Sequence, residues 1–249
     1  MKTECLYLND TYRFACETVL RRFGSDERGG FAVFDQTVFC PQGGGQPCDK
    51  GTISVNGTEV AVSFVGLQDG EILHYGEFPG GDARIGDESC ARRTIDDAHM
   101  EIDGGRRMIN AGIHTAGHLV AAVVESMSVS LVALKGYHFP EGPYIEFQGP
   151  RPENGEEFIV QANVALETAL QAALVVTVEW VSPSALEIRG LRLPEGRQSE
   201  GPLRVVRIGA YPPVPCGGTH VRCLTEIAGV SLSKIKAKGG NLRVSYQVG

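Results

Sequence analysis

The sequence predicts an α+β protein: a small N-terminal β-barrel, then a two-layer α/β domain with helices packed on an antiparallel sheet. Short strand-like runs separated by turn signals fill the first 75 residues. Later stretches, at residues 108–127 and 155–173, repeat apolar residues at helical spacing. After Cys90 the sequence becomes charged and compatible with helix. We therefore expect two domains, residues 1–90 and 91–249, with the boundary between 85 and 98.

The expected strands of the first domain are short and bounded by turn residues. Asn56-Gly57 and Asp69-Gly70 are pairs that favour two-residue hairpin turns. The strands are expected at residues 12–20, 31–39, 52–55, 60–65 and 71–75.

In the second domain, Asp103 and the two glycines after it are expected to begin the first helix. Asn154, with Glu157 three residues later, predicts a cap for a second helix with its own apolar stripe. The other expected elements are strands at 129–134, 144–147, 174–181, 203–208, 230–236 and 242–248, and a short helix from Ser182-Pro183 to Glu187.

Two distant motifs predict a metal site. In a helix, His114 and His118 lie one turn apart on one face. Cys216 follows a proline and precedes two glycines, so the chain can turn and bring Cys216 and His220 to one point. One cysteine and three histidines form a donor set that zinc prefers. The helix buries the opposite stripe, which consists of Ile109, Ile113, Ala116, Val120, Val123 and Met127.

Missing residues exclude several kinds of site. A zincin protease carries Glu after the first histidine, where this chain has Thr115. A zinc deaminase needs a second cysteine where Thr219 stands. The run Gln42-Gly43-Gly44-Gly45-Gln46 lacks the ending of a P-loop and the spacing of a dinucleotide fingerprint, so no ATP or nucleotide cofactor is expected.

Composition limits the remaining choices. The net charge of −7 argues against a general nucleic-acid binder, although a local basic patch is compatible with it. No apolar stretch is long enough for a bilayer, and residues 1–4 do not resemble a signal peptide, so a cytoplasmic protein without membrane contact is expected. Seven cysteines without disulfide spacing fit a reducing compartment.

The two metal motifs together resemble those of the editing domains of alanyl-tRNA synthetase and of the free-standing AlaX proteins. More distantly, they are similar to the editing domain of threonyl-tRNA synthetase. The Gly-rich run with Asp49 and Gly51, the pair Arg106-Arg107, the segment from Lys135-Gly136 to Phe147 and the terminal Lys-rich hairpin extend the resemblance over nearly the whole chain. Gly117 departs from the family pattern, in which a larger residue or a threonine often stands, and this bears on the size of the pocket.

The resemblance implies an aminoacyl-tRNA deacylase that acts in trans on a mischarged tRNA, with Ser-tRNA(Ala) or Gly-tRNA(Ala) as substrate and the acceptor end as the bound region. It implies zinc held by His114, His118, Cys216 and His220. It also implies that the Gly-rich loop takes part in amino-acid selection. Substrate contacts are expected from Thr115, Gln42, Gly43, Gly44, Gly45, Gln46, Gly217 and Gly218, and tRNA contacts from Arg106, Arg107, Lys234, Lys236 and Lys238.

The mechanism has two forms at this stage. If all four protein ligands bind tightly, zinc is a scaffold or an ion that orients the substrate. If His220 binds loosely, a zinc-associated water can act as the nucleophile. No protein general base is assigned. Thr115 is expected to bond the serine hydroxyl, its alternative being a bond back to a helix carbonyl. The rival functions are a non-catalytic zinc-stabilised RNA-binding module and a zinc hydrolase of a small ester.

Overall fold

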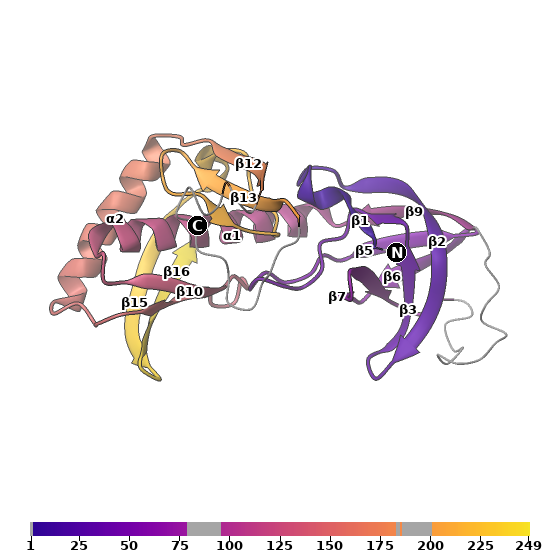
Figure 1. Ribbon diagram of the computed structural model, residues 1–249, viewed down its shortest axis with the longest axis horizontal. Helices are drawn as coiled ribbons and strands as arrows, with labels where there is room; N and C mark the ends of the chain where they lie inside the picture. The colour runs from indigo at the N-terminus through magenta and orange to yellow at the C-terminus, as the bar shows by residue number, and fades with distance from the viewer. Residues whose placement is uncertain (1, 79–95, 183–184, 186–200) are drawn as a thin grey trace. The chain divides into compact units, whose positions relative to one another are not determined.

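The computed structural model describes residues 2–78, 96–182, 185 and 201–249, and divides the chain into two compact units, Met1–Ile109 and Asn110–Gly249 (Figure 1). The division falls inside helix α1 (Gly104–Met127), later than the boundary expected near residue 90. The reason is strand β9 (Asp96–Ile102), which pairs with β2 (Ala15–Asp26) and β5 (Gly51–Val55) in the sheet of the first unit.

The first unit is a seven-stranded antiparallel sheet in the order β6-β5-β9-β2-β3-β8-β7. Both predicted hairpin turns are confirmed, because Asn56, Gly57, Asp69 and Gly70 all have the positive φ that such turns require. The remaining strands of this unit are β3 (Gly29–Phe34), β6 (Thr58–Val62), β7 (Phe64–Gln68) and β8 (Glu71–Tyr75), with β1 (Glu4–Cys5) and β4 (Gln36–Thr37) pairing separately.

The α+β class is confirmed, but a closed barrel is not. Among the described residues no ladder joins β6 to β7, the two ends of the seven-stranded order. Closure of the barrel therefore stays a prediction.

Strand β9 was not expected from its charged sequence. Ala98, Met100 and Ile102 are all buried and alternate with polar residues, so the period of two was present. The segment expected as one strand at 60–65 is interrupted at Ser63, whose N–H donates to the Tyr75 carbonyl oxygen and whose flanking residues belong to β6 and β7.

The second unit contains a four-stranded antiparallel sheet in the order β10-β11-β16-β15. Its strands are β10 (Val132–Tyr137), β11 (Tyr144–Gln148), β15 (Val230–Lys238) and β16 (Asn241–Val248). One face is buried, and it consists of Ile145, Phe147, Leu232, Ile235, Leu242, Val244 and Tyr246. On α2 (Gly155–Gln171), Asn163 bonds both the N–H and the carbonyl oxygen of Leu232, which ties this helix to β15.

The predicted start of α1 after Asp103 and the predicted cap of α2 at Asn154 are confirmed. The Arg106 N–H donates to Asp103 Oδ1 over 2.9 Å, and the Glu157 N–H donates to Asn154 Oδ1 over 3.1 Å. The predicted stripe of α1 is wrong at Ile109, which is 57% exposed. From Asn110 to Gly117 every residue of α1 is buried, so His114 lies inside the unit and not on an open helix face.

A small antiparallel sheet, β12-β13-β14, carries the second metal motif. Its strands are β12 (Val176–Val181), β13 (Leu203–Ile208) and β14 (Val214–Pro215), and Cys216 follows β14 directly. The short helix expected from Ser182-Pro183 to Glu187 lies outside the described residues except at 182 and 185. No helix in the described part of the chain has the length and apolar character that crossing a membrane requires.

Candidate metal centre

The structure brings the two predicted motifs together. The ligand atoms of His114, His118, Cys216 and His220 all lie within 4.8 Å of one another. Cys216 Sγ is 3.3 Å from His220 Nε2 and 3.6 Å from His114 Nε2. In a tetrahedral zinc site these atoms would be about 3.6 Å apart, given ordinary zinc–sulfur and zinc–nitrogen bonds. The donor set and its spacing therefore fit a metal ion, consistent with zinc.

Local structure explains why the four side chains converge. Helical spacing places the His114 and His118 rings 5.0 Å apart, and the His220 ring lies 4.5 Å and 4.7 Å from them. On the other side, the Cys216 N–H donates to the Arg204 carbonyl oxygen, which holds the start of the turn against β13. The Gly218 N–H then points at Cys216 Sγ over 3.4 Å.

Burial keeps the three imidazoles uncharged at neutral pH. It holds the pKa values of His114 and His220 well below the usual range, and it lowers the pKa of His118 to about 4. The positive charge of Arg204 lowers all three pKa values further. A neutral imidazole offers a lone pair, so these histidines are ready to bind a cation. His118 and Cys216 are the partly exposed members, which gives the cluster an accessible side.

Thr115 supports the cluster from behind. Its side chain is fully buried, and Oγ1 lies 2.8 Å from the Ala111 carbonyl oxygen, 3.0 Å from His220 Nδ1 and 3.2 Å from the Val221 N–H. A hydroxyl has one proton, which goes to Ala111, so His220 Nδ1–H must donate to Thr115 and His220 Nε2 is left for the metal. The structure contains the alternative expected for Thr115, a hydrogen bond from its hydroxyl to a helix carbonyl oxygen. The hydroxyl is therefore not open to a serine substrate.

His138 is a neighbour of the site that no sequence motif indicated. Its ring stacks on His114 at 4.5 Å between centroids, and its Nδ1 is 2.7 Å from the Tyr246 hydroxyl. Tyr246 donates to the Ile113 carbonyl oxygen over 3.0 Å, so His138 Nδ1 carries the proton. The ring thus buttresses the first ligand and is itself held by Tyr246 of the main sheet.

The position of His138 explains Gly117. A Cβ at Gly117 would come within 2.3 Å of His138 Cε1, and one at Gly136 within 2.1 Å of His138 Nε2. The space beside Gly117 is therefore occupied by the ring and not left open. The two glycines, in helix and strand, are a sequence signal that could have indicated a large side chain between them.

Arg204 was also missed. It is 6% exposed, and its Nη1 donates to the Cys216 carbonyl oxygen over 2.7 Å. A buried arginine beside the thiol places a fixed positive charge next to the candidate ligands. Nothing in the local sequence distinguishes it from the exposed arginines.

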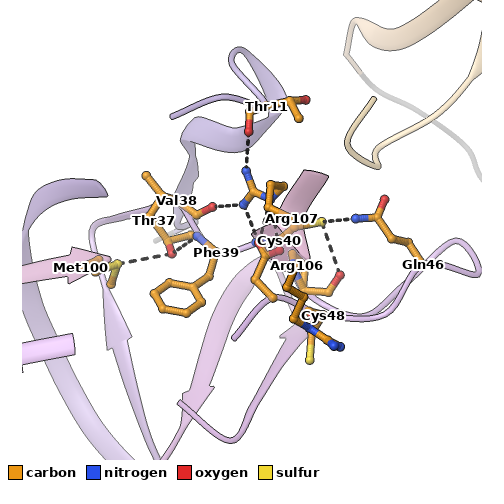
Figure 2. Close-up of polar contacts among 12 residues, drawn as sticks. Thr11, Thr37, Val38, Phe39, Cys40, Gln46, Cys48, Met100, Arg106 and Arg107 are labelled. Carbon is orange, nitrogen blue, oxygen red and sulfur yellow. Dashed lines mark hydrogen bonds and ion pairs between the residues drawn. The ribbon is translucent and has the colours of Figure 1, made fainter. Parts of the chain in front are cut away.

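Arg107, expected to contact tRNA, is fully buried inside the first unit. Figure 2 shows its polar contacts with Thr11 and Val38. Its guanidinium pairs with Asp49, which is also fully buried, and donates to the carbonyl oxygens of Thr11 and Val38. The guanidinium is used by the protein and is not available to RNA. Asp49 belongs to the Gly-rich motif, so this ion pair fixes the motif against the start of α1. Arg106 donates from its Nε to the Cys48 carbonyl oxygen.

The Gly-rich loop forms a tight turn. Gly43 and Gln46 bond each other's backbone, and Gly44 and Gly45 adopt φ values of 57° and 80°. Gln42 is exposed at this turn, whereas the Gln46 side chain is fully buried. In the second unit, Lys234, Lys236 and Lys238 are all exposed on β15, as their alternation predicted.

Comparison with known proteins confirms the resemblance. A family described as tRNA synthetases class II (A) matches residues 16–97. The chain is 29% identical to the alanyl-tRNA editing protein AlaX-M of Methanosarcina barkeri, covering 98% of both chains. It is 27% identical to AlaX-L of Pyrococcus horikoshii over 99% of its own length and 58% of that protein. It is also 30% identical to an alanine–tRNA ligase of Korarchaeum cryptofilum, covering 99% of this chain and 26% of the ligase.

The packing of His138 predicts the effect of a methyl group at Gly117. Gly117→Ala should lower the free energy of unfolding by about 1 to 3 kcal/mol, because the ring must move. Gly112→Ala is the matched control, since a Cβ there meets nothing within 4 Å, and it should be neutral or slightly stabilising. Urea unfolding at a fixed zinc concentration measures both. Part of the destabilisation by Gly117→Ala should disappear in a His138→Ala background, and equal effects at Gly112 and Gly117 would contradict this account.

The hydrogen bond from His220 to Thr115 predicts a metal-binding defect. Thr115→Val keeps the shape but removes the acceptor for His220 Nδ1–H, so zinc affinity should fall about 10- to 100-fold. Thr115→Ser keeps the hydroxyl and should bind zinc with nearly the original affinity. Competition with a chromophoric chelator measures both constants. Unchanged affinity in the folded valine variant would show that Thr115 does not orient His220.

Proposed function

We propose that the protein hydrolyses the ester bond of mischarged aminoacyl-tRNA in trans, with Ser-tRNA(Ala) as the expected substrate and Gly-tRNA(Ala) as a second one. The observation that carries the proposal is the convergence of His114, His118, Cys216 and His220 into one cluster. The similarity to proteins named alanyl-tRNA editing proteins, which extends over nearly the whole chain, supports the substrate class.

The metal we assign is zinc, because three imidazoles and one thiolate form a donor set of structural and catalytic zinc sites. When bound, zinc would act as a Lewis acid that orients and polarises a polar group of the substrate. Thr115 fixes His220 from behind, and this favours four protein ligands over a site with a loose His220. The partial exposure of His118 and Cys216 leaves the aminoacyl ester a side from which to approach.

Selection of the amino acid requires polar groups that are not already used. Because the Thr115 hydroxyl has three protein partners, we assign the serine-reading role to the Gly-rich turn with Gln42, whose side chain is exposed. Gln46 is fully buried, so its role is to support the turn. Gly217 is exposed and has no atom near the place of a Cβ, so its backbone is open to close approach by a substrate. Gly218 is buried with its N–H directed at Cys216 Sγ, so its expected substrate contact has no such support.

The test of the proposed function compares deacylation of Ser-, Gly- and Ala-tRNA(Ala) by the purified protein. Wild type should contain one zinc per chain, hydrolyse the Ser or Gly ester and spare the Ala ester. Cys216→Ala should lose both the zinc and the activity. A folded, zinc-loaded protein that binds RNA but cleaves none of the three would favour a non-catalytic module. Equal cleavage of simple amino-acid esters would favour a small-ester hydrolase.

The role of the Gly-rich turn has its own test. Gly44→Asn preserves the turn, since asparagine tolerates positive φ, and adds a side chain at the exposed tip. The ratio of the Ser-tRNA hydrolysis rate to the Ala-tRNA hydrolysis rate should fall roughly tenfold, which corresponds to about 1.4 kcal/mol. Gly57→Asn makes the same change in another hairpin with φ of 77° and should leave the ratio unchanged. If Gly44→Asn and Gly57→Asn have the same ratio of hydrolysis rates, the Gly-rich run is only a structural turn.

A further inference from the structure

The four-stranded sheet of the second unit has two different faces. One face is the buried core, whereas the other carries polar and aromatic side chains that alternate with it along each strand. We call this outer side the basic-aromatic face. Its residues are Lys135 and Tyr137 on β10, Tyr144 and Glu146 on β11, Arg243 and Ser245 on β16, and Lys234, Lys236 and Lys238 on β15.

The basic-aromatic face is positively charged, whereas the whole chain has a negative net charge. The protein carries a net charge of −7, yet the residues just named include five cations and only one acid, Glu146. Glu146 is paired with Lys135 at 3.2 Å and with Arg243 at 3.0 Å. Lys234 lines a surface hollow that also contains Glu153 and Glu156. Lys234, beside Lys236 on the strand, lowers the pKa of Lys236, as expected for crowded like charges. A bound polyanion would relieve that repulsion.

Aromatic rings form a column on the same face. Phe139 stacks on Tyr137 at 4.4 Å with an angle of 13° between the planes, and Tyr137 stacks on Tyr144 at 5.1 Å and 16°. The guanidinium of Arg243 continues the column 3.7 Å from the Tyr144 centroid. Tyr137 is 36% exposed at the edge strand β10. The rings are therefore held parallel in advance and reach solvent.

Protection of a sheet edge against pairing with another chain explains the lysines of this face but not its aromatic rings. Lysines on the edge strand β15 would discourage pairing with another chain. Tyr137, exposed on the opposite edge strand β10, and the rings of Phe139 and Tyr144 aligned with it do not serve that purpose, because they add apolar surface. Proteins that bind unpaired nucleotides combine a basic surface for the phosphates with aromatic rings for the bases.

We propose that the basic-aromatic face binds the RNA of the substrate, with an unpaired nucleotide stacked on Phe139, the partly exposed end ring of the column, and phosphates held by Lys234, Lys236 and Lys238. The proposal rests on the proposed function, which supplies an RNA substrate. It extends the three expected lysine contacts to a whole sheet face, and it assigns part of the affinity to stacking. The face lies on the sheet formed by β10, β11, β16 and β15 (Figure 1).

Two RNAs separate the stacking part from the phosphate part. One is a minihelix with an unpaired 3′ end, and the other is the same duplex with a blunt end, both measured by fluorescence anisotropy with the zinc-loaded protein. Phe139→Leu should weaken binding of the overhang RNA roughly fivefold to a hundredfold and leave the blunt duplex nearly unchanged. Phe139→Tyr keeps the ring and should bind both RNAs like wild type.

The lysines predict a different pattern. Lys234→Gln with Lys236→Gln should weaken binding of both RNAs, and the slope of log affinity against log salt should fall by about 0.7 to 0.9 for each phosphate that the variant no longer neutralises. Lys2→Gln with Arg13→Gln removes the same charge from exposed positions of the first unit and is the matched control. Equal weakening by the control pair, or unchanged overhang binding by folded Phe139→Leu, would overturn the proposal.

Failure of the inference can be told apart from failure of the proposed function. If these variants weaken RNA binding as expected but wild type cleaves no aminoacyl ester, the face is correct and the function is not. If wild type deacylates Ser-tRNA and the variants keep their KM, the function stands and RNA binds elsewhere.

Discussion

Convergence of nitrogen and sulfur ligand atoms on one largely buried point is the constraint on which the second unit depends. His114 and His220 are almost completely buried, and their ligand atoms point at one another and at a thiol from a segment about a hundred residues away. Polar atoms are costly to bury unless each of them has a partner. One cation satisfies all four at once, so binding energy at this point is also folding energy.

The surroundings of the cluster follow from that constraint. Thr115 leaves His220 only one free nitrogen, and Tyr246 fixes the proton of His138 so that its ring can stack on His114. Close packing has its own requirement, since only glycine at 117 and 136 leaves room for the His138 ring. These partners come from α1, β10, β16 and the turn after β14, so the site integrates most of the unit.

The sequence predicted the parts of the fold that depend on local chemistry. The four candidate ligands could be predicted because i,i+4 spacing and a Pro/Gly turn are local signals. The start of α1 at Asp103 and the cap at Asn154 could be predicted for the same reason. Burial of Arg107 was missed because it depends on Asp49, 58 positions away. The role of Thr115 was misjudged because its decisive partner, His220, is 105 positions away. His138 has no motif of its own, and β9 was concealed by its charged residues.

The number and kind of ligands around one metal ion test the proposed centre most directly. X-ray absorption at the zinc edge of the purified protein measures them. We predict one sulfur at about 2.3 Å and three imidazole nitrogens at about 2.0 to 2.1 Å. A spectrum without sulfur, or one with fewer than three imidazoles bound to the metal, would contradict the closed site of His114, His118, Cys216 and His220.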